Sequence, residues 1–91
     1  MTDPTLDLHR KRLRFRSRHR GTRELDLLLG RFAEAHLDAM TAEQLDRYAA
    51  LLENGDPEIY DWLTGRAAVP PAQDHDVMRL LQRFNFHEPR S

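Results

Sequence analysis

The spacing of the apolar residues restricts this chain to a helical fold. Leu25, Leu28, Leu29 and Phe32 recur at positions i, i+3, i+4 and i+7, which places the four side chains on one face of an α-helix. Similar helical spacing returns in three later segments of the sequence. No segment alternates apolar and polar residues over the length of a strand. The sequence therefore predicts an all-α protein.

Five helices are expected, because residues that favour helix starts or ends separate the apolar segments. Thr41-Ala42-Glu43-Gln44 has the pattern of a capping box, in which the Thr and Gln side chains bond backbone N–H groups at a helix start. The first helix is expected from Pro4 to His19, and the others begin near Thr22, Thr41, Asp56 and Val77. Short connections between amphipathic helices are typical of a compact antiparallel bundle.

Length and composition agree with one small folded domain. The chain has 91 residues, of which 40% are hydrophobic and 32% charged, an ordinary balance for a globular protein. We expect a single domain over residues 1–91, with a helical core at about 4–85 and a tail at 86–91. Cysteine is absent, so disulfides, thiol catalysis and thiolate metal sites are excluded.

The sequence shows no signal for a membrane or for secretion. Every apolar run is shorter than the roughly 18 residues that a membrane-spanning helix needs. Residues 1–8 lack the apolar stretch of a signal peptide. We therefore expect a cytoplasmic protein without a membrane partner.

Charge is distributed unevenly along the chain. Residues 1–23 have a balance of +6, whereas residues 24–91 have a balance of −7, which suggests a basic docking surface on an acidic body. Basic stripes of this kind can contact nucleic-acid phosphates or an acidic protein surface. Charge alone leaves both interpretations open. The arginines form two i, i+4 stripes on the first helix: Arg10, Arg14 and Arg18, and Arg12, Arg16 and Arg20.

The first helix also has apolar residues on two sides. At 100° per residue, Leu6 and Leu13 share one face, and Leu8 and Phe15 share nearly the opposite face. Both pairs cannot pack against a single surface of a bundle. Either one pair is exposed among arginines, a composition typical of partner-binding surfaces, or the helix is shorter than expected.

No residue pattern indicates an active site. The histidines have neither the i, i+4 spacing nor the His-Glu-x-x-His pattern of helical metal sites. Ser17 and Ser91 do not lie in a nucleophile elbow, and the glycines form no phosphate-binding loop. We predict no catalytic residue, no cofactor-binding residue and no metal ligand. The scattered histidines are His9, His19, His36, His75 and His87.

One short motif carries more information than the charge pattern. Arg20-Gly21-Thr22-Arg23-Glu24 resembles the Arg-Gly-x-x-Glu motif of the succinate dehydrogenase flavin-assembly factors. The resemblance continues through Leu51-Leu52-Glu53, the block from Asp56 to Leu63 and the segment from Val77 to Leu81. It covers about residues 10–86 in the order of the family. It implies the family's five-helix bundle.

The resemblance implies a helper protein and not an enzyme. Members of the family promote covalent attachment of FAD to the flavoprotein subunit of succinate dehydrogenase, where a histidine joins the 8α-methyl carbon through the flavin's own redox chemistry. The factor is expected to bind the flavoprotein as a monomer and to hold no cofactor itself. The flavoprotein of fumarate reductase is a second possible client. The alternative, from the basic helix, is a small nucleic-acid-binding or antitoxin-like regulator.

The resemblance also implies which residues contact the partner. The motif residues would lie at the centre of the contact, and neighbouring arginines would steer and anchor the factor against acidic residues of the flavoprotein. The central residues are Arg20, Gly21 and Glu24, and the anchoring residues are Arg16, Arg18 and Arg23.

Each of the prominent residues has a simpler structural explanation. Arg20 would be a solvated charge at a helix end, and Gly21 a helix stop in the left-handed conformation. Glu24 would stabilise the start of a helix, because its negative charge interacts favourably with the helix dipole. The family resemblance favours partner contact for these three residues. Trp62 is expected in the core, because it is spaced with Ile59 on a helical face.

Overall fold

The computed structural model describes residues 4–87, with side chains to residue 84, and all regular secondary structure in this part is helical. The α-helices are α1 (Pro4–Arg18), α2 (Arg23–His36), α3 (Ala42–Leu52), α4 (Asp56–Thr64) and α5 (Asp76–His87), with 3₁₀ helices η1 (Leu37–Ala39) and η2 (Pro71–Gln73). The predicted all-α fold with five helices is confirmed. No helix among the described residues is long and apolar enough to cross a membrane.

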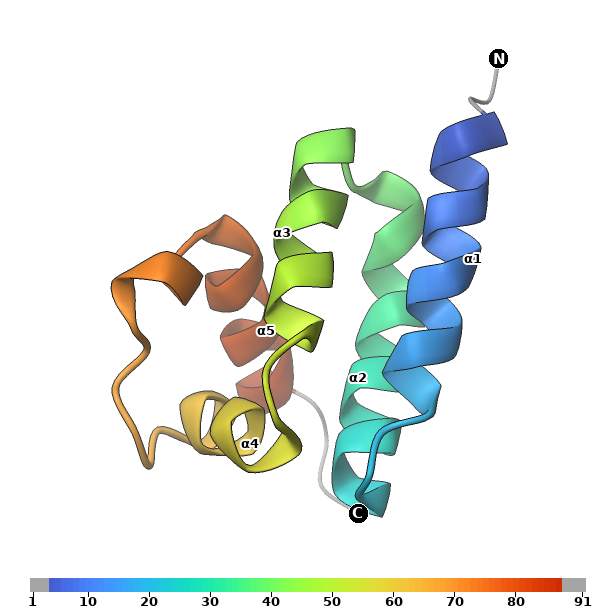
Figure 1. Cartoon of the computed structure of the whole chain (residues 1–91). Helices are drawn as coiled ribbons and strands as arrows, with labels where there is room; N and C mark the ends of the chain where they lie inside the picture. Colours follow the sequence, from blue (N-terminus) through green and yellow to red (C-terminus); the bar gives the residue numbers. More distant parts are fainter. Residues whose placement is uncertain (1–3, 88–91) are drawn as a thin grey trace.

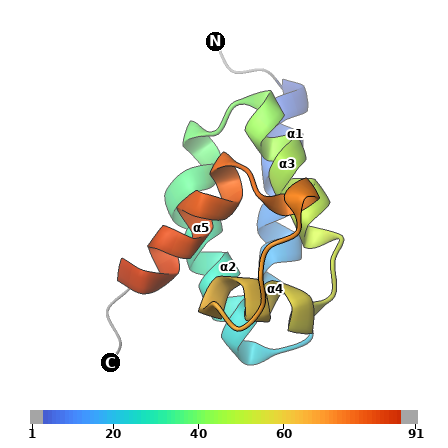
Figure 2. The ribbon, with the colours of Figure 1, turned by 90° about the vertical axis from the view of Figure 1, so that its left-hand side faces the viewer.

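The helices form a bundle in which two distant turns meet. α1 and α2 run antiparallel side by side, and α3 contacts α1 (Figure 1). α5 contacts α2, α3 and α4, and the turned view shows α5 in front of α2 with α4 below it (Figure 2). The turn from α1 to α2 and the turn from α3 to α4 lie at the same end of the bundle. This arrangement brings the candidate motif next to the start of α4.

Local signals explain the helix boundaries. Thr22 and Thr41 are the N-caps of α2 and α3, and Gln44 completes the predicted capping box by accepting a hydrogen bond from the Thr41 N–H at 3.0 Å. α4 ends at Gly65, whose φ of 79° is the left-handed conformation that favours glycine. α5 continues to His87, so residues 86 and 87, expected in the tail, are helical. The remaining expected tail, 88–91, lies outside the described residues.

A single hydrophobic core lies between the helices. Tyr48 and Phe32 are its largest fully buried side chains, with ring centroids 5.5 Å apart. Trp62, expected in the core, is buried there. Each fully buried Leu or Ile stabilises the fold by about 1.5–3 kcal/mol relative to an exposed position. The other members are Leu13, Leu25, Leu29, Ala33, Leu37, Met40, Leu45, Leu51, Leu52, Ile59, Leu63, Val77, Met78 and Leu81.

The two apolar faces of the first helix have different environments. Leu13 is buried and Leu6 packs against the core, so this face fixes α1 to the bundle. Leu8 and Phe15 are 47% and 63% exposed. Because α1 extends from Pro4 to Arg18, the alternative of a shorter helix is wrong. One apolar pair is exposed among basic residues.

A buried polar pair joins α1 to α3. The Ser17 hydroxyl donates to the Leu13 carbonyl at 2.7 Å, and its oxygen lies 2.6 Å from the Tyr48 hydroxyl. Because the Ser17 proton is used by Leu13, Tyr48 is the donor to Ser17. Burial raises the pKa of Tyr48 to about 12. The neutral phenol is therefore part of the folded state.

This pair predicts a loss of stability at alkaline pH. The phenol of an unfolded chain has a pKa of about 10, so the Tyr48 contribution is full below that pH and is lost as pH rises toward the folded value. We expect the free energy of unfolding to fall by about 1 kcal/mol from this group between pH 10 and 11. Urea unfolding of the unaltered protein and of Tyr48→Phe across this range measures the difference. Equal pH slopes in the two proteins would contradict it.

Candidate partner-binding site

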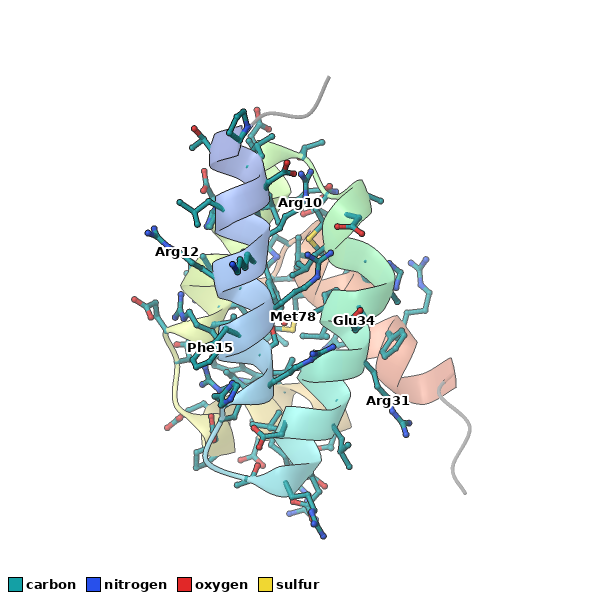
Figure 3. All side chains as sticks on the ribbon, turned by 90° about the vertical axis from the view of Figure 1, so that its right-hand side faces the viewer. Arg10, Arg12, Phe15, Arg31, Glu34 and Met78 are labelled. Atoms are coloured by element: carbon teal, nitrogen blue, oxygen red, sulfur yellow. The ribbon has the colours of Figure 1, made fainter. Side chains whose placement is uncertain are left out.

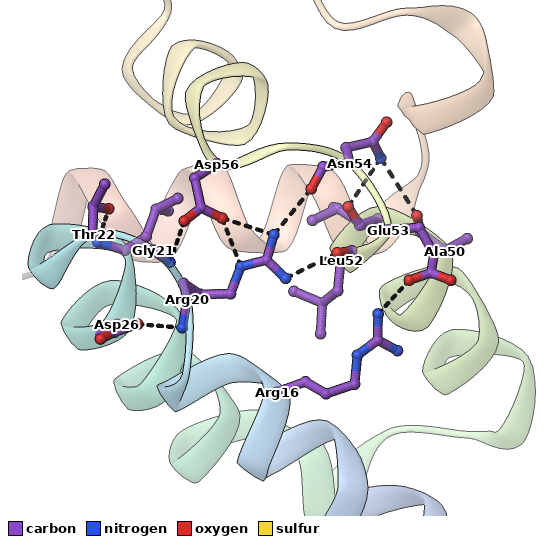
Figure 4. A network of polar contacts seen from close by, with 12 residues as sticks. Arg16, Arg20, Gly21, Thr22, Asp26, Ala50, Leu52, Glu53, Asn54 and Asp56 are labelled. Atoms are coloured by element: carbon purple, nitrogen blue, oxygen red, sulfur yellow. Dashed lines mark hydrogen bonds and ion pairs between the residues drawn. The ribbon is translucent and has the colours of Figure 1, made fainter.

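The side chain of Arg20 points into the bundle and not toward solvent (Figure 4). Its Nε–H donates to Asp56 Oδ1 at 2.8 Å. Its two terminal nitrogens donate to the carbonyls of Leu52 and Asn54, each at 2.9 Å. Arg20 therefore connects the turn between α1 and α2 with the turn between α3 and α4.

Two physical effects make this position favourable for arginine. The carbonyls at the end of α3 lack helical N–H partners, and a cation near a helix C-terminus is favoured by the dipole. Only 12% of the Arg20 side chain and 14% of the Asp56 side chain are exposed, so water screens the pair weakly. The interpretation of Arg20 as a solvated charge at a helix end is therefore wrong.

Gly21 lies against the same carboxylate. Its N–H donates to Asp56 Oδ2, and a Cβ atom on residue 21 would lie 2.9 Å from that oxygen. Among the described glycines, Gly65 has the positive φ, so the expected left-handed helix stop at Gly21 is wrong. The absence of a side chain at Gly21 permits a close approach within the chain.

The start of α2 is fixed by short-range contacts. The Arg20 N–H donates to Asp26 Oδ1, and Thr22 Oγ1 accepts from the Leu25 N–H at 3.4 Å. Together with Asp56, these contacts hold the backbone on both sides of Gly21. Arg23 and Glu24 follow in the first turn of α2 and are exposed. Neither has an ion pair within residues 4–84 of the structure, so their charges are available to a partner.

Most arginines of α1 already have partners within the chain. Arg14 pairs with Asp38, Arg16 with Glu53 and Arg18 with Glu34. Arg10 donates to the carbonyls of Leu37 and Met40, each at 2.9 Å. Acids of the body thus pair with three arginines of the helix, which leaves fewer unpaired cations for the suggested basic docking surface than the sequence alone indicates. Among the described residues of α1, Lys11 and Arg12 have no ion pair.

The structure brings together only part of the predicted site. Arg20 and Gly21 meet at Asp56, and Arg23 and Glu24 follow on the exposed first turn of α2. Arg16 and Arg18 lie on α1 with 37% and 52% of their side chains exposed. Sequence reasoning missed Asp56 as the partner of the motif, because it lies 36 positions from Arg20. Within the described residues no group of three or more His, Asp or Glu side chains could hold a metal ion.

These features define a small all-helical protein, in which an internally fixed turn presents exposed charged side chains. The sequence model of the family described as flavinator of succinate dehydrogenase matches residues 11–85. The chain belongs to this family.

Curated relatives agree with this assignment. The FAD assembly factor SdhE of Acetobacter pasteurianus is 44% identical over 81 residues, which are 89% of this chain and 74% of the relative. Succinate dehydrogenase assembly factor 2, mitochondrial, of Lodderomyces elongisporus is 42% identical over 98% of this chain and 57% of its own length. The protein of the same name from Meyerozyma guilliermondii is 40% identical over 98% of this chain and 69% of its own length. The chain thus spans little more than half of some relatives.

The ion pair of Arg20 predicts a large and coupled effect on stability. Asp56→Ala should destabilise the fold by about 2–3 kcal/mol, because the mostly buried guanidinium would lose its counter-charge. The double variant Arg20→Ala/Asp56→Ala should lose less free energy of unfolding than the two single variants lose together, by about 1–2 kcal/mol. Urea unfolding measures these values. Arg79→Ala, from an exposed pair with Asp74, is the control and should change stability by at most about 1 kcal/mol. Additive single effects at Arg20 and Asp56 would contradict the account.

Gly21 predicts an effect that depends on Asp56. Gly21→Ala should cost about 1–2 kcal/mol, because the Asp56 carboxylate must move away from the new Cβ atom. Gly21→Asn should cost at least as much, since residue 21 lacks the left-handed φ that asparagine tolerates. In an Asp56→Ala background the cost of Gly21→Ala should nearly vanish. The same cost in both backgrounds, measured by urea unfolding, would rule out the carboxylate contact as its cause.

Proposed function

We propose that this protein promotes covalent attachment of FAD to the flavoprotein subunit of succinate dehydrogenase by binding that subunit. The observation that supports this function is the exposed first turn of α2, with Arg23 and Glu24 following a turn fixed by Arg20 and Asp56. This turn lies in a chain of the flavinator family. Two of its relatives are named as an FAD assembly factor and a succinate dehydrogenase assembly factor.

The motif residues have different roles in this proposal. Glu24 offers a carboxylate to a basic group or N–H donor of the flavoprotein, and Arg23 offers a guanidinium to a carboxylate. Arg20 and Gly21 determine where this turn lies, through Asp56. Arg16 and Arg18 are predicted anchors at the rim of the contact, where each would share its cation between an acid of this chain and one of the partner.

The chemical step belongs to the flavoprotein and its FAD. Covalent attachment requires the flavin's methyl carbon and the receiving histidine to be held at reacting distance, and fixing such a geometry lowers the barrier. We propose that the factor contributes this positioning as a monomer, catalyses no step itself and has no resident cofactor. The flavoprotein of fumarate reductase is proposed as a second client, and the cytoplasm as the compartment.

The nucleic-acid alternative has less support. Continuous phosphate binding needs unpaired cations along one face. The i, i+4 stripes that suggested it contain Arg14, Arg16, Arg18 and Arg20, which pair with acids of the same chain. Arg12 is the exposed stripe member without an ion pair in the described part of the chain.

Glu24 gives the test of this function. Glu24→Ala should change the free energy of unfolding by only about 0.3–1 kcal/mol, the value of an exposed acid at a helix start. Covalent flavin on the flavoprotein should nevertheless fall severalfold. The measurement is flavin fluorescence of the denatured flavoprotein subunit from cells that produce each variant.

Glu43→Ala is the matched control for this experiment. Glu43 is also an exposed acid in the first turn of a helix, α3, so its loss has the same effect on a helix dipole. In cells that produce Glu43→Ala, the amount of covalent flavin on the flavoprotein should equal that in cells with the unaltered protein. Equal amounts of covalent flavin on the flavoprotein with Glu24→Ala and Glu43→Ala would show that Glu24 is not part of the binding site.

A further inference from the structure

The outer face of α1 has an apolar groove that the motif does not use. Leu8 and Phe15 are two of the three large hydrophobic side chains exposed in the described part of the chain. Phe15 and Arg12 project from the side of α1 that faces away from α2 (Figure 3). The groove has a volume of about 410 Å³ and is lined by Leu8, Lys11, Arg12, Phe15 and Arg16.

The aromatic ring in this groove is held in place before any partner binds. Phe15 stacks on His19 with ring centroids 3.9 Å apart and an interplanar angle of 16°. His19 Nδ1 lies 2.7 Å from the Phe15 carbonyl oxygen, which holds the imidazole against the helix. A ring that is already ordered loses little conformational entropy on binding. Phe15 therefore has the properties of a binding anchor.

The charge around the groove specifies the partner's chemistry. Lys11 and Arg12 have no ion pair among the described residues, although neighbouring arginines on α1 are paired with acids. Leu8 and Phe15 are seven residues apart, which corresponds to about 10 Å along a helix. A complementary segment would carry carboxylates opposite Lys11 and Arg12. It would also have apolar residues two helical turns apart, as an acidic amphipathic helix does.

We propose that this groove is a second docking surface, which binds an acidic amphipathic helix of the flavoprotein subunit. The proposal rests on the proposed function for the identity of the partner. Phe15 of the groove stacks on His19, which immediately precedes Arg20 and its turn, so the two contact regions are continuous along the chain. Simultaneous contact at both regions orients the flavoprotein more strictly than the motif alone.

Other occupants fit the groove less well. Binding to anionic lipid commonly uses clusters of about four to eight basic residues, whereas Lys11 and Arg12 are the unpaired cations here. A second copy bound through the same groove would place these two cations against themselves, because a two-fold contact uses one patch on both subunits. Both occupants are outcomes of the test below.

The test measures binding to the purified flavoprotein subunit that holds FAD non-covalently. Phe15→Ala should raise the dissociation rate about tenfold, because it removes an apolar anchor. Lys11→Glu with Arg12→Glu should lower the association rate about tenfold at low salt and much less at high salt. The control is Arg66→Glu with Arg79→Glu, an equal charge change outside α1, for which both rates should change by at most about twofold. Melting temperatures show whether each variant is folded.

Photo-cross-linking identifies the occupant directly. With p-benzoylphenylalanine in place of Phe15, we expect a cross-link to an acidic helix of the flavoprotein. A cross-link to a second copy of this chain, or co-sedimentation with phosphatidylglycerol vesicles that Phe15→Ala abolishes, would overturn the proposal. If both groove variants bind the flavoprotein with unchanged association and dissociation rates while Glu24→Ala binds more weakly, the groove is not a docking surface, and the proposed function still stands. Failure of the unaltered protein to bind the flavoprotein would overturn the proposed function as well.

Discussion

The ion pair between Arg20 and Asp56 is the interaction on which the geometry of the site depends. It joins two turns at one end of the bundle, and the same carboxylate accepts the Gly21 N–H. Arg20 also binds carbonyls at the end of α3 that no helical N–H can reach. A rigid turn results, and the first turn of α2 extends from it into solvent. Part of the motif thus determines the structure, and the next part is free to contact a partner.

The same principle explains the uneven charge of the chain. The basic first helix packs on an acidic body, and opposite charges meet across that contact at Arg14, Arg16 and Arg18. Exposed pairs of this kind add little stability individually. They nevertheless leave Lys11 and Arg12 as the unpaired cations of α1 in the described structure. The unpaired positive charge of α1 is therefore confined to a small area beside Leu8 and Phe15.

Local sequence signals predicted the helices, because helical spacing and capping act within a few residues. Thr41 with Gln44 and the burial of Trp62 are examples. Contacts between distant residues were not predictable, since they depend on how the helices pack. The sequence places Asp56 at the start of a helix and of a family block, but does not indicate its pairing with Arg20. The buried bond between Ser17 and Tyr48, 31 positions apart, has no sequence signal. The sequence singles out Gly21, but the reason for glycine at this position is the neighbouring Asp56 carboxylate, which leaves no room for a Cβ atom. A left-handed backbone conformation is not the reason.

The central claim is that Arg20 positions the motif from within and that Glu24 contacts the flavoprotein. A crystal structure of the complex with the flavoprotein subunit tests this claim most directly. The account predicts that Arg20 stays bonded to Asp56, Leu52 and Asn54, while Glu24 lies within hydrogen-bonding distance of a flavoprotein side chain. A complex in which Arg20 leaves Asp56 to bind the flavoprotein, or in which Glu24 faces solvent, would contradict it.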